Sequence, residues 1–474
     1  MKRLSVLLLC AVLLLSACGG AASASLGPPV SSSGSALPQA PVPEAANALR
    51  PLSQGNGDGY YYTISASNAL TPGDARYLLH YLDYAAMRDI VLCSSPGCAH
   101  NSEACPAFAD LTVLNAPFAA GGCLVDFCGP WDGAPPQIVV TELDGTNRRV
   151  VHTLSSGQFF SSPVVNRRGN HDVPYFEDGT FVYFPVTTIV YGAETTADGF
   201  PIAASITAEV CRLDPAAGRV DKVADLAVDG LVQGMSCATG GDYLFGALGR
   251  ELLVKHYRDD YSAFTFTAIN VDTGARRDIA GWALPGDVPY GAAPGEGAVS
   301  CGENLAQVLD GKIYLPDWAH RAYRTIDPLT GEGSLTLAAL DERCLPDFLP
   351  PIRAALDGWL LVDEPVDRSD PSRPDDFALE TLHYAVRPDT GEKRELTAGS
   401  IVMDSFAPLS VLARAGDQVL TSYTANESRA PRLQSDGSIH MALASESYYA
   451  LIPVDDLLAN DQSALREFWP LEAK

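Results

Sequence analysis

One short turn recurs along this 474-residue chain and limits the folds open to it. Each copy runs from an acidic residue to a glycine, and the final glycines of the clear copies stand at positions 145, 218, 274, 331 and 391. They are therefore 73, 56, 57 and 60 residues apart. Asp-Gly or Gly-Asp pairs accompany them, at 178–179, 241–242, 310–311, 357–358 and 416–417. Because glycine adopts the positive φ that tight hairpins need, the series indicates regularly spaced hairpins.

Short strand-like segments lie between these turns. They are rich in β-branched and aromatic residues and include 60–64, 137–141, 181–186, 243–245, 312–315 and 359–362. Acidic turns at 82–85 and 454–456 extend the series at both ends, so the chain holds about seven units. Long stretches of helical period are missing, and the best helix candidate is the short segment 457–468.

These units predict an all-β fold, a single β-propeller of about seven four-stranded blades. One blade cannot bury both faces of its sheet, whereas a closed ring packs every blade between two neighbours. Two smaller β domains, such as sandwiches, are the alternative, but the spacing is fairly even and no linker interrupts the chain after residue 60. The units resemble those of TolB-like and YVTN-type propellers, in which a strand ends in Asp-x-x-Thr-Gly before the next strand begins.

The N-terminus predicts export and lipidation. Lys2 and Arg3 precede the apolar run 4–15, which is too short to span a bilayer stably. The Leu-Ser-Ala-Cys sequence that ends at Cys18 resembles a bacterial lipobox, which implies a diacylglycerol on that thiol; an ordinary secretory signal is the alternative. We therefore predict a signal peptide over 1–17, a lipidated and disordered Ala/Ser/Pro/Gly-rich tether over 18–58, and the propeller over 59–474.

The charge of the chain excludes some partners. Its formal net charge is −26, with 58 acidic and 32 basic residues. Binding to DNA or RNA through phosphates needs clustered Lys and Arg, so we expect no nucleic-acid partner. We expect a monomer whose membrane contact is the lipid anchor. The chain should then lie at the extracytoplasmic face of the membrane, most plausibly at a Gram-positive cell surface.

Three cysteines and one histidine gather within 13 residues, from Cys93 through Cys98 and His100 to Cys105. The segment follows the motif Cys-x-x-Pro-x-Cys-x-His-x4-Cys-x-Ala, which ends at Ala107. This motif resembles one found in lipid-anchored propellers of Gram-positive gut bacteria, and the resemblance implies no particular activity.

Two chemistries explain this cluster. Cys93, Cys98, His100 and Cys105 could bind Zn²⁺ as a Cys₃His site, since four N and S ligands complete a tetrahedron. Disulfides are the favoured alternative, because exported cysteines oxidise. Cys98 would then pair with Cys105, and Cys93 with Cys123 or Cys128. The further expected pairs are Cys211 with Cys237, and Cys301 with Cys344.

The sequence contains no nucleophile elbow, P-loop, dinucleotide fingerprint or zinc-protease motif. The first hypothesis is therefore a non-catalytic binding or scaffold propeller for an extracellular protein, peptide or glycan. The second is an extracellular hydrolase or lyase that acts on glycans or peptides through carboxylates in the propeller channel. The third is a metal-binding module built on the Cys-His cluster.

Overall fold

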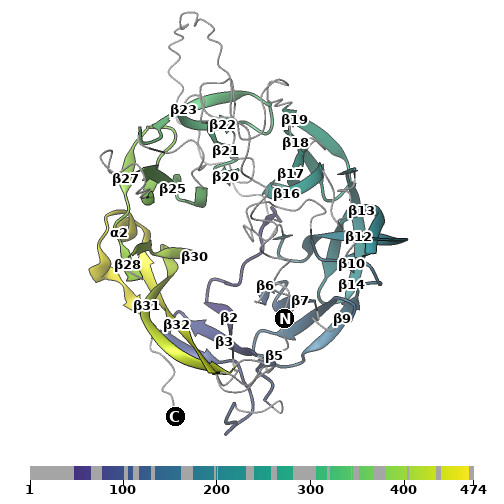
Figure 1. Ribbon diagram of the computed structural model, residues 1–474, viewed down its shortest axis with the longest axis horizontal. Helices are drawn as coiled ribbons and strands as arrows, with labels where there is room; N and C mark the ends of the chain where they lie inside the picture. The colour runs from purple at the N-terminus through teal and green to yellow at the C-terminus, as the bar shows by residue number, and fades with distance from the viewer. Residues whose placement is uncertain are drawn as a thin grey trace, which may run out of the picture.

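The computed structural model is a ring of seven blades around a central axis (Figure 1), which confirms the predicted all-β propeller. It describes residues 47–65, 77–100, 105–109, 117–129, 134–161, 175–196, 199, 201–230, 240–257, 264–280, 306–317, 321–342, 344, 352–367, 379–402, 405–433 and 439–468. The predicted signal peptide, Cys18 and the first part of the predicted tether lie outside these residues.

The blades follow one another in chain order, and we number them 1 to 7. The first three comprise β2 (Gly59–Ser65), β3 (Tyr77–Asp83), β4 (Arg88–Val91) and β5 (Phe108–Ala109); β6 (Phe118–Ala120), β7 (Cys123–Cys128), β8 (Gln137–Glu142) and β9 (Arg149–Thr153); and β10 (Gln158–Phe159), β11 (Phe176–Glu177), β12 (Val182–Thr195), β13 (Pro201–Asp214) and β14 (Arg219–Leu226).

Blades 4 to 7 repeat the plan. They comprise β15 (Val228–Asp229), β16 (Gly240–Leu248), β17 (Glu251–Tyr257), β18 (Phe264–Asn270) and β19 (Arg276–Ala280); β20 (Gln307–Leu309), β21 (Lys312–Asp317), β22 (Ala322–Ile326) and β23 (Gly333–Ala339); β24 (Ile352–Leu356), β25 (Trp359–Asp367), β26 (Leu379–Val386) and β27 (Lys393–Glu395); and β30 (Ser410–Ala415), β31 (Gln418–Leu433), β32 (Ile439–Pro453) and β33 (Arg466–Glu467). A hairpin of β28 (Gly399–Val402) and β29 (Ser405–Pro408) precedes blade 7. All strand pairings are antiparallel. Within a blade, the first strands of the chain lie toward the axis of the ring and the last strands lie at its rim (Figure 1).

The recurring acidic turns connect the last two strands of the blades, as the sequence predicts. Their glycines have positive φ, for example 66° at Gly218 and 69° at Gly274. The glycines also touch the preceding blade, because a Cβ on Gly274 would lie 2.6 Å from the Val223 carbonyl oxygen. The Gly-Asp pair at 241–242 does not form a turn, because it lies inside β16. The turn between β16 and β17 is at Gly249 instead. Local turn chemistry therefore also sets the spacing between blades.

Seven apolar clusters hold the ring together, one at each interface between neighbouring blades, which we call a seam. Among the described residues, the seam between blades 2 and 3 has 15 buried members, including Phe127 and Phe184. The 3–4, 4–5, 5–6 and 6–7 seams have 11, 8, 10 and 12. The ring closes at the 7–1 seam, where seven apolar residues, including Tyr62 and Leu420, are buried. In the described chain no strand of blade 7 pairs with a strand of blade 1. The 1–2 seam has four. Closure therefore depends on apolar packing. Burial of one large apolar side chain contributes about 1.5 to 3 kcal/mol to the free energy of folding.

An N-terminal segment, 47–58, crosses the inner side of several blades, and we call it the strap. The Leu49 amide donates to the Gly249 carbonyl oxygen of blade 4 (2.7 Å). β1 (Arg50–Pro51) pairs with β11 of blade 3, and Ser53 bridges to Ala119 of blade 2. Figure 1 shows this purple segment running inside the ring toward β2. Residues 47–58, which the sequence predicts to be part of the tether, therefore contact blades 2, 3 and 4 in the structure.

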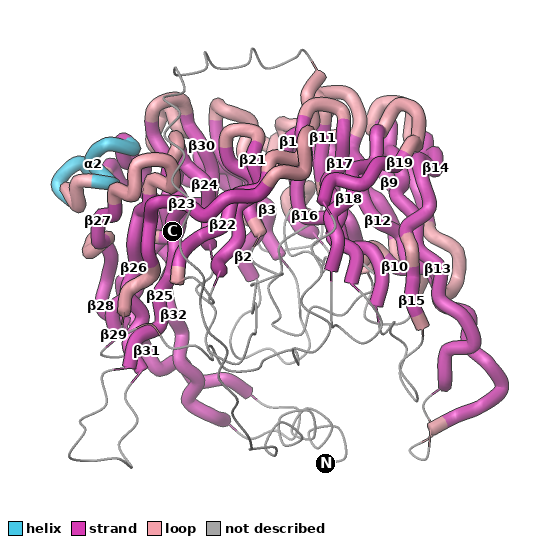
Figure 2. The backbone as a smooth tube through the Cα atoms, turned by 90° about the horizontal axis from the view of Figure 1, so that it is seen from above, coloured by secondary structure: helices cyan, strands magenta, loops and turns pink. Residues whose placement is uncertain are grey.

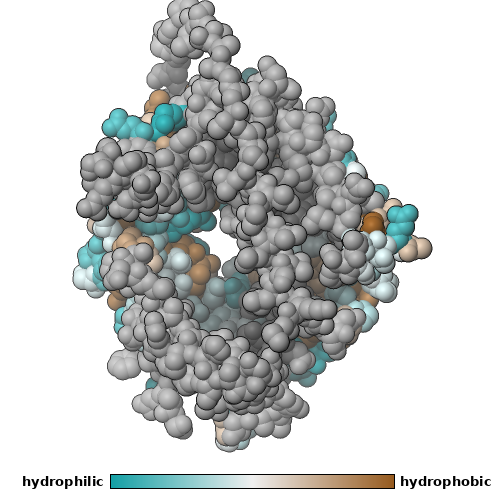
Figure 3. All heavy atoms as spheres, in the orientation of Figure 1, coloured by the Kyte–Doolittle hydropathy of each residue, from teal (hydrophilic) through white to brown (hydrophobic). Residues whose placement is uncertain are grey.

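The two ends of the ring differ. In Figure 2 short turns crowd one end, near β1, β11 and β17, and the hairpin of β12 and β13 extends beyond the other end. The exposed Val190 and Tyr191 lie on this extension. Where Figure 3 shows described residues, hydrophilic and hydrophobic ones are interspersed over the visible face.

Helix is scarce in the described chain. α2 (Val454–Leu458) overlaps only the start of the predicted helical segment 457–468, and the single turn η2 (Gln462–Ala464) lies within that segment. α2 buries Val454, Leu457 and Leu458 in the 6–7 seam. Within the described residues, no helix combines the length and the apolar character that a membrane crossing requires.

Candidate metal centre

The Cys-His cluster lies on a loop that interrupts the outer edge of blade 1. Both β4 and β5 pair with β3, and they lie end to end along it. The Leu92 amide donates to the Leu79 carbonyl oxygen (2.9 Å), and the Leu79 amide donates to the Ala107 carbonyl oxygen (2.8 Å). The outer strand therefore continues across Leu79, and residues 93–106 leave it and return at the same point.

The loop brings the four predicted ligands together. Each of Cys93, Cys98, His100 and Cys105 offers one ligand atom, and these atoms all lie within 4.8 Å of one another. The Nδ1 atom of His100 lies 3.3 Å from the Cys105 Sγ. A tetrahedral Zn²⁺ site with bonds of about 2.0 to 2.3 Å needs ligand atoms roughly 3.5 to 4 Å apart, so the arrangement fits such a cation.

Backbone conformation makes this convergence available. Gly97 has a φ of 71°, and His100 has a φ of 52°, in the left-handed region that non-glycine residues seldom occupy. The Cys98 amide closes a turn onto the Ser95 carbonyl oxygen (3.2 Å). These two reversals bend the loop back, so that ligands up to 12 positions apart face one centre.

The thiols of the cluster differ in their electrostatic surroundings. The pKa of Cys98 is lowered, chiefly because the His100 backbone N–H donates to its sulfur. Burial raises the pKa of Cys105 to about 12, which disfavours its thiolate in the absence of a cation. A divalent cation at the centre would reverse that preference, because it binds the thiolate form. The site is therefore suited to a positive charge.

Among the described residues the structure contains no disulfide. Cys98 and Cys105 are both free thiols, and they converge with the Cys93 thiol and the His100 imidazole. Cys123 donates instead to the Ala120 carbonyl oxygen (3.2 Å), and Cys128 is buried at the end of β7. Cys211 and Cys344 are buried free thiols, and their expected partners, Cys237 and Cys301, lie outside the described residues.

The remaining histidines in the described blades do not converge on a second site. Three of them bind a carboxylate of the same blade, at 2.6 to 2.9 Å: His80 with Asp89, His256 with Asp242, and His383 with Asp363. Asp242 raises the pKa of His256 through that hydrogen bond. The pairs lie in blades 1, 4 and 6, so each is an internal contact of one blade.

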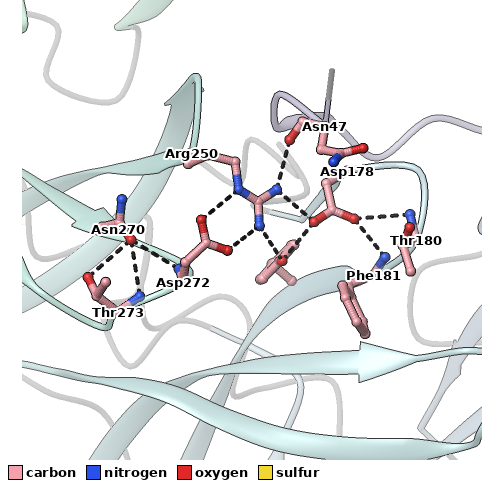
Figure 4. A network of polar contacts seen from close by, with 9 residues as sticks. Asn47, Asp178, Thr180, Phe181, Arg250, Asn270, Asp272 and Thr273 are labelled. Carbon is pink, nitrogen blue, oxygen red and sulfur yellow. Dashed lines mark hydrogen bonds and ion pairs between the residues drawn. The ribbon is translucent and has the colours of Figure 1, made fainter. Parts of the chain in front are cut away.

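A polar network that sequence reasoning missed joins the strap to blades 3 and 4 (Figure 4). Arg250 donates to Asp178 (2.7 Å), to Asp272 (3.0 and 2.5 Å) and to the Asn47 carbonyl oxygen (2.7 Å). The Asp178 carboxylate also accepts from the Phe181 amide of its own turn (2.8 Å). Turn residues therefore present two carboxylates at neighbouring corners of adjoining blades, and one guanidinium bridges them.

Four of the five buried carboxylates in the described blades serve as ion-pair partners. Glu177 binds Arg50 of the strap, and Asp178 binds Arg250. In the later blades, Asp242 binds Arg276 and His256, and Glu364 binds Lys393. A general acid needs a carboxyl group whose proton is exchanged with substrate. These four groups are instead neutralised by neighbouring cations, and they hold strands and blades together.

The comparisons with known proteins find solved structures of low similarity. No family model matches the chain, and no curated protein matches it. Among solved structures, an oligogalacturonate lyase in complex with manganese is 12% identical, with a TM-score of 0.42, over 79% of this chain and 85% of the lyase. An acylaminoacyl peptidase is 10% identical, with a TM-score of 0.44, over 90% of this chain and 53% of the peptidase, so this chain spans about half of that enzyme. TolB from Acinetobacter baumannii is 13% identical, with a TM-score of 0.29, over 72% of this chain and 63% of TolB.

Proposed function

We propose that this protein is a non-catalytic binding or scaffold propeller whose blade 1 holds a structural Zn²⁺ ion. The observation that carries the proposal is the convergence of Cys93, Cys98, His100 and Cys105 on one centre. Four protein ligands fill a tetrahedron and leave no open position for water or substrate, which is the pattern of structural and not catalytic zinc. The ion pairs of four buried carboxylates support the same non-catalytic role.

The donor set favours Zn²⁺ over harder cations. Three thiolates and one imidazole are soft or borderline ligands, which select Zn²⁺ and reject Mg²⁺ and Ca²⁺. Zinc also has no preferred geometry of its own, so it accepts the tetrahedron that the loop provides. The site does not suit Mn²⁺, which prefers oxygen ligands, because the cluster offers none.

Elemental analysis of the purified protein tests the metal. We expect about one Zn²⁺ per chain, and we expect Cys105→Ser to lose it because only three ligands remain. Cys211→Ser is the matched control, since Cys211 is a buried thiol of blade 3 outside the cluster. Purified wild type that carries far less than one Zn²⁺ per chain would show that the cluster does not bind zinc. Full zinc occupancy in Cys105→Ser would show that the zinc is bound elsewhere.

The display of this propeller outside the cell is a further part of the proposal, and the lipobox-like segment that ends at Cys18 supports it. Two or more acyl chains hold a protein to a membrane stably. We expect the full chain to sediment with membranes and Cys18→Ser to move to the soluble fraction. A Cys18→Ser variant that stays with the membranes as the wild type does would contradict the anchor.

A further inference from the structure

We infer that metal occupancy of the Cys₃His site controls the packing of blade 1 against blade 2, so that the site acts as a latch for this seam. The inference rests on the proposed metal site and adds its regulatory consequence. The seam holds four buried apolar residues in the described chain, Tyr61, Leu79, Leu92 and Leu124, fewer than any other seam. The next smallest has seven. A seam with so little apolar burial depends more on each member and on whatever holds that member in place.

Two of the metal ligands are adjacent to residues that build the seam. Cys93 directly follows Leu92, which is buried in the seam and bonded to the Leu79 carbonyl oxygen (2.9 Å). The backbone carbonyl oxygen of Cys105 accepts a hydrogen bond from the Phe108 amide at the start of β5 (3.0 Å). Ala107, 1% exposed, holds the Leu79 amide on its carbonyl oxygen (2.8 Å). A metal that ties Cys93 to Cys105 therefore also ties together the two ends of the interrupted strand at Leu79.

Blade 2 touches this arrangement directly. Gly145, in the last turn of blade 2, packs against Leu92, and a Cβ on Gly145 would lie 2.6 Å from the Leu92 carbonyl oxygen. Leu124 of β7 completes the cluster from the same blade. The two ends of the interrupted strand are otherwise held by the backbone hydrogen bonds at Leu79 and by the small apolar cluster. Loss of metal should therefore loosen this seam first.

Hydrogen–deuterium exchange of the zinc-loaded protein, before and after removal of zinc by a chelator, tests the latch. We expect exchange at Leu79, Leu92 and Leu124 to rise by about tenfold or more, a local opening. We expect little change at Leu361 and Ile452 in the 6–7 seam, which has 12 buried members. Zinc that binds and leaves without a change at the 1–2 seam would overturn the latch and leave the proposed metal site intact. Equal loss of protection in every seam would also overturn it, whereas absence of zinc would refute the proposed function itself.

The reverse coupling gives a second test that needs no unfolding. Reciprocity requires a strain at the seam to weaken metal binding. Gly145→Ala would push on Leu92 beside Cys93, so we expect its zinc affinity to fall by about tenfold, within the usual range of such couplings. Gly122→Ala is the matched control, because Gly122 also lies in blade 2 with positive φ (77°) but has no atom within 4 Å of an added Cβ. Equal affinity of the two variants would contradict the coupling.

Discussion

Arg250→Met is expected to lower the free energy of unfolding by about 3 to 5 kcal/mol at neutral pH, because it leaves a buried charge without its partner. The Asp178 side chain is 3% exposed, and Arg250 is the cation within 2.7 Å of it. The variant also releases Asp272 and the Asn47 carbonyl oxygen, so blade 3, blade 4 and the strap lose a shared contact. Chemical denaturation, followed by aromatic fluorescence, measures the loss.

The pH dependence of this variant follows from the same contact. Burial raises the pKa of Asp178, but Arg250 and the turn amides offset it, so that the net pKa lies below its usual value; Arg250 also lowers the pKa of Asp272. Depressed carboxyl pKa values contribute stability above about pH 4 and lose it as the pH falls through the folded-state values. The deficit of Arg250→Met should therefore be largest near neutral pH and shrink below pH 4.

Arg219→Met is the matched control for this prediction. Its side chain is 62% exposed, and it binds Asp221 at 3.0 Å on the surface of blade 3. Exposed ion pairs contribute about 0 to 1 kcal/mol. If Arg250→Met were no more destabilising than Arg219→Met, the network of Figure 4 would not hold the blades together.

Lys393→Met should have a comparable effect at the 5–6 seam. The Glu364 side chain is completely buried and accepts from the Lys393 Nζ at 2.8 and 2.7 Å. Glu364 also accepts from the Tyr323 hydroxyl (3.1 Å) and the Asp341 amide (2.9 Å) of the neighbouring blade. Removal of the ammonium leaves a buried carboxylate, so we expect a loss of about 3 to 5 kcal/mol in denaturant unfolding.

A double variant separates the charge from the shape of the Glu364 site. Glu364→Gln combined with Lys393→Met removes the charge and keeps one acceptor oxygen for the Asp341 amide, while the new side-chain NH2 can donate to the Tyr323 hydroxyl oxygen. The double variant should therefore recover part of the stability lost in Lys393→Met. Lys222→Met, at an exposed pair with Asp225, should cost under about 1 kcal/mol. A double variant less stable than Lys393→Met would show that the buried charge is not the cause.

Features that depend on neighbours in the chain were predictable. The turn glycines Gly218 and Gly274 indicate hairpins because positive φ is a local requirement, and seven such hairpin units require a ring to bury their faces. The ligand set was predictable for the same reason, since its members lie within 13 residues and a loop of that length can bring them together. The choice between metal and disulfide was not predictable, because it depends on where each sulfur points; the structure shows no disulfide among the described residues and brings the four ligand atoms together.

Contacts between distant segments were decided by the tertiary structure. Arg50 and Glu177 are 127 positions apart, and Arg250 and Asp178 are 72 apart, so no local pattern links them. The strap shows the same limit: its Pro- and Gly-containing sequence is typical of a linker, yet Leu49 and Leu52 are buried against the blades. Propensities and turns act over a few residues and are readable in order along the chain. Burial and charge pairing arise when the ring closes, and they depend on which surfaces that closure brings together.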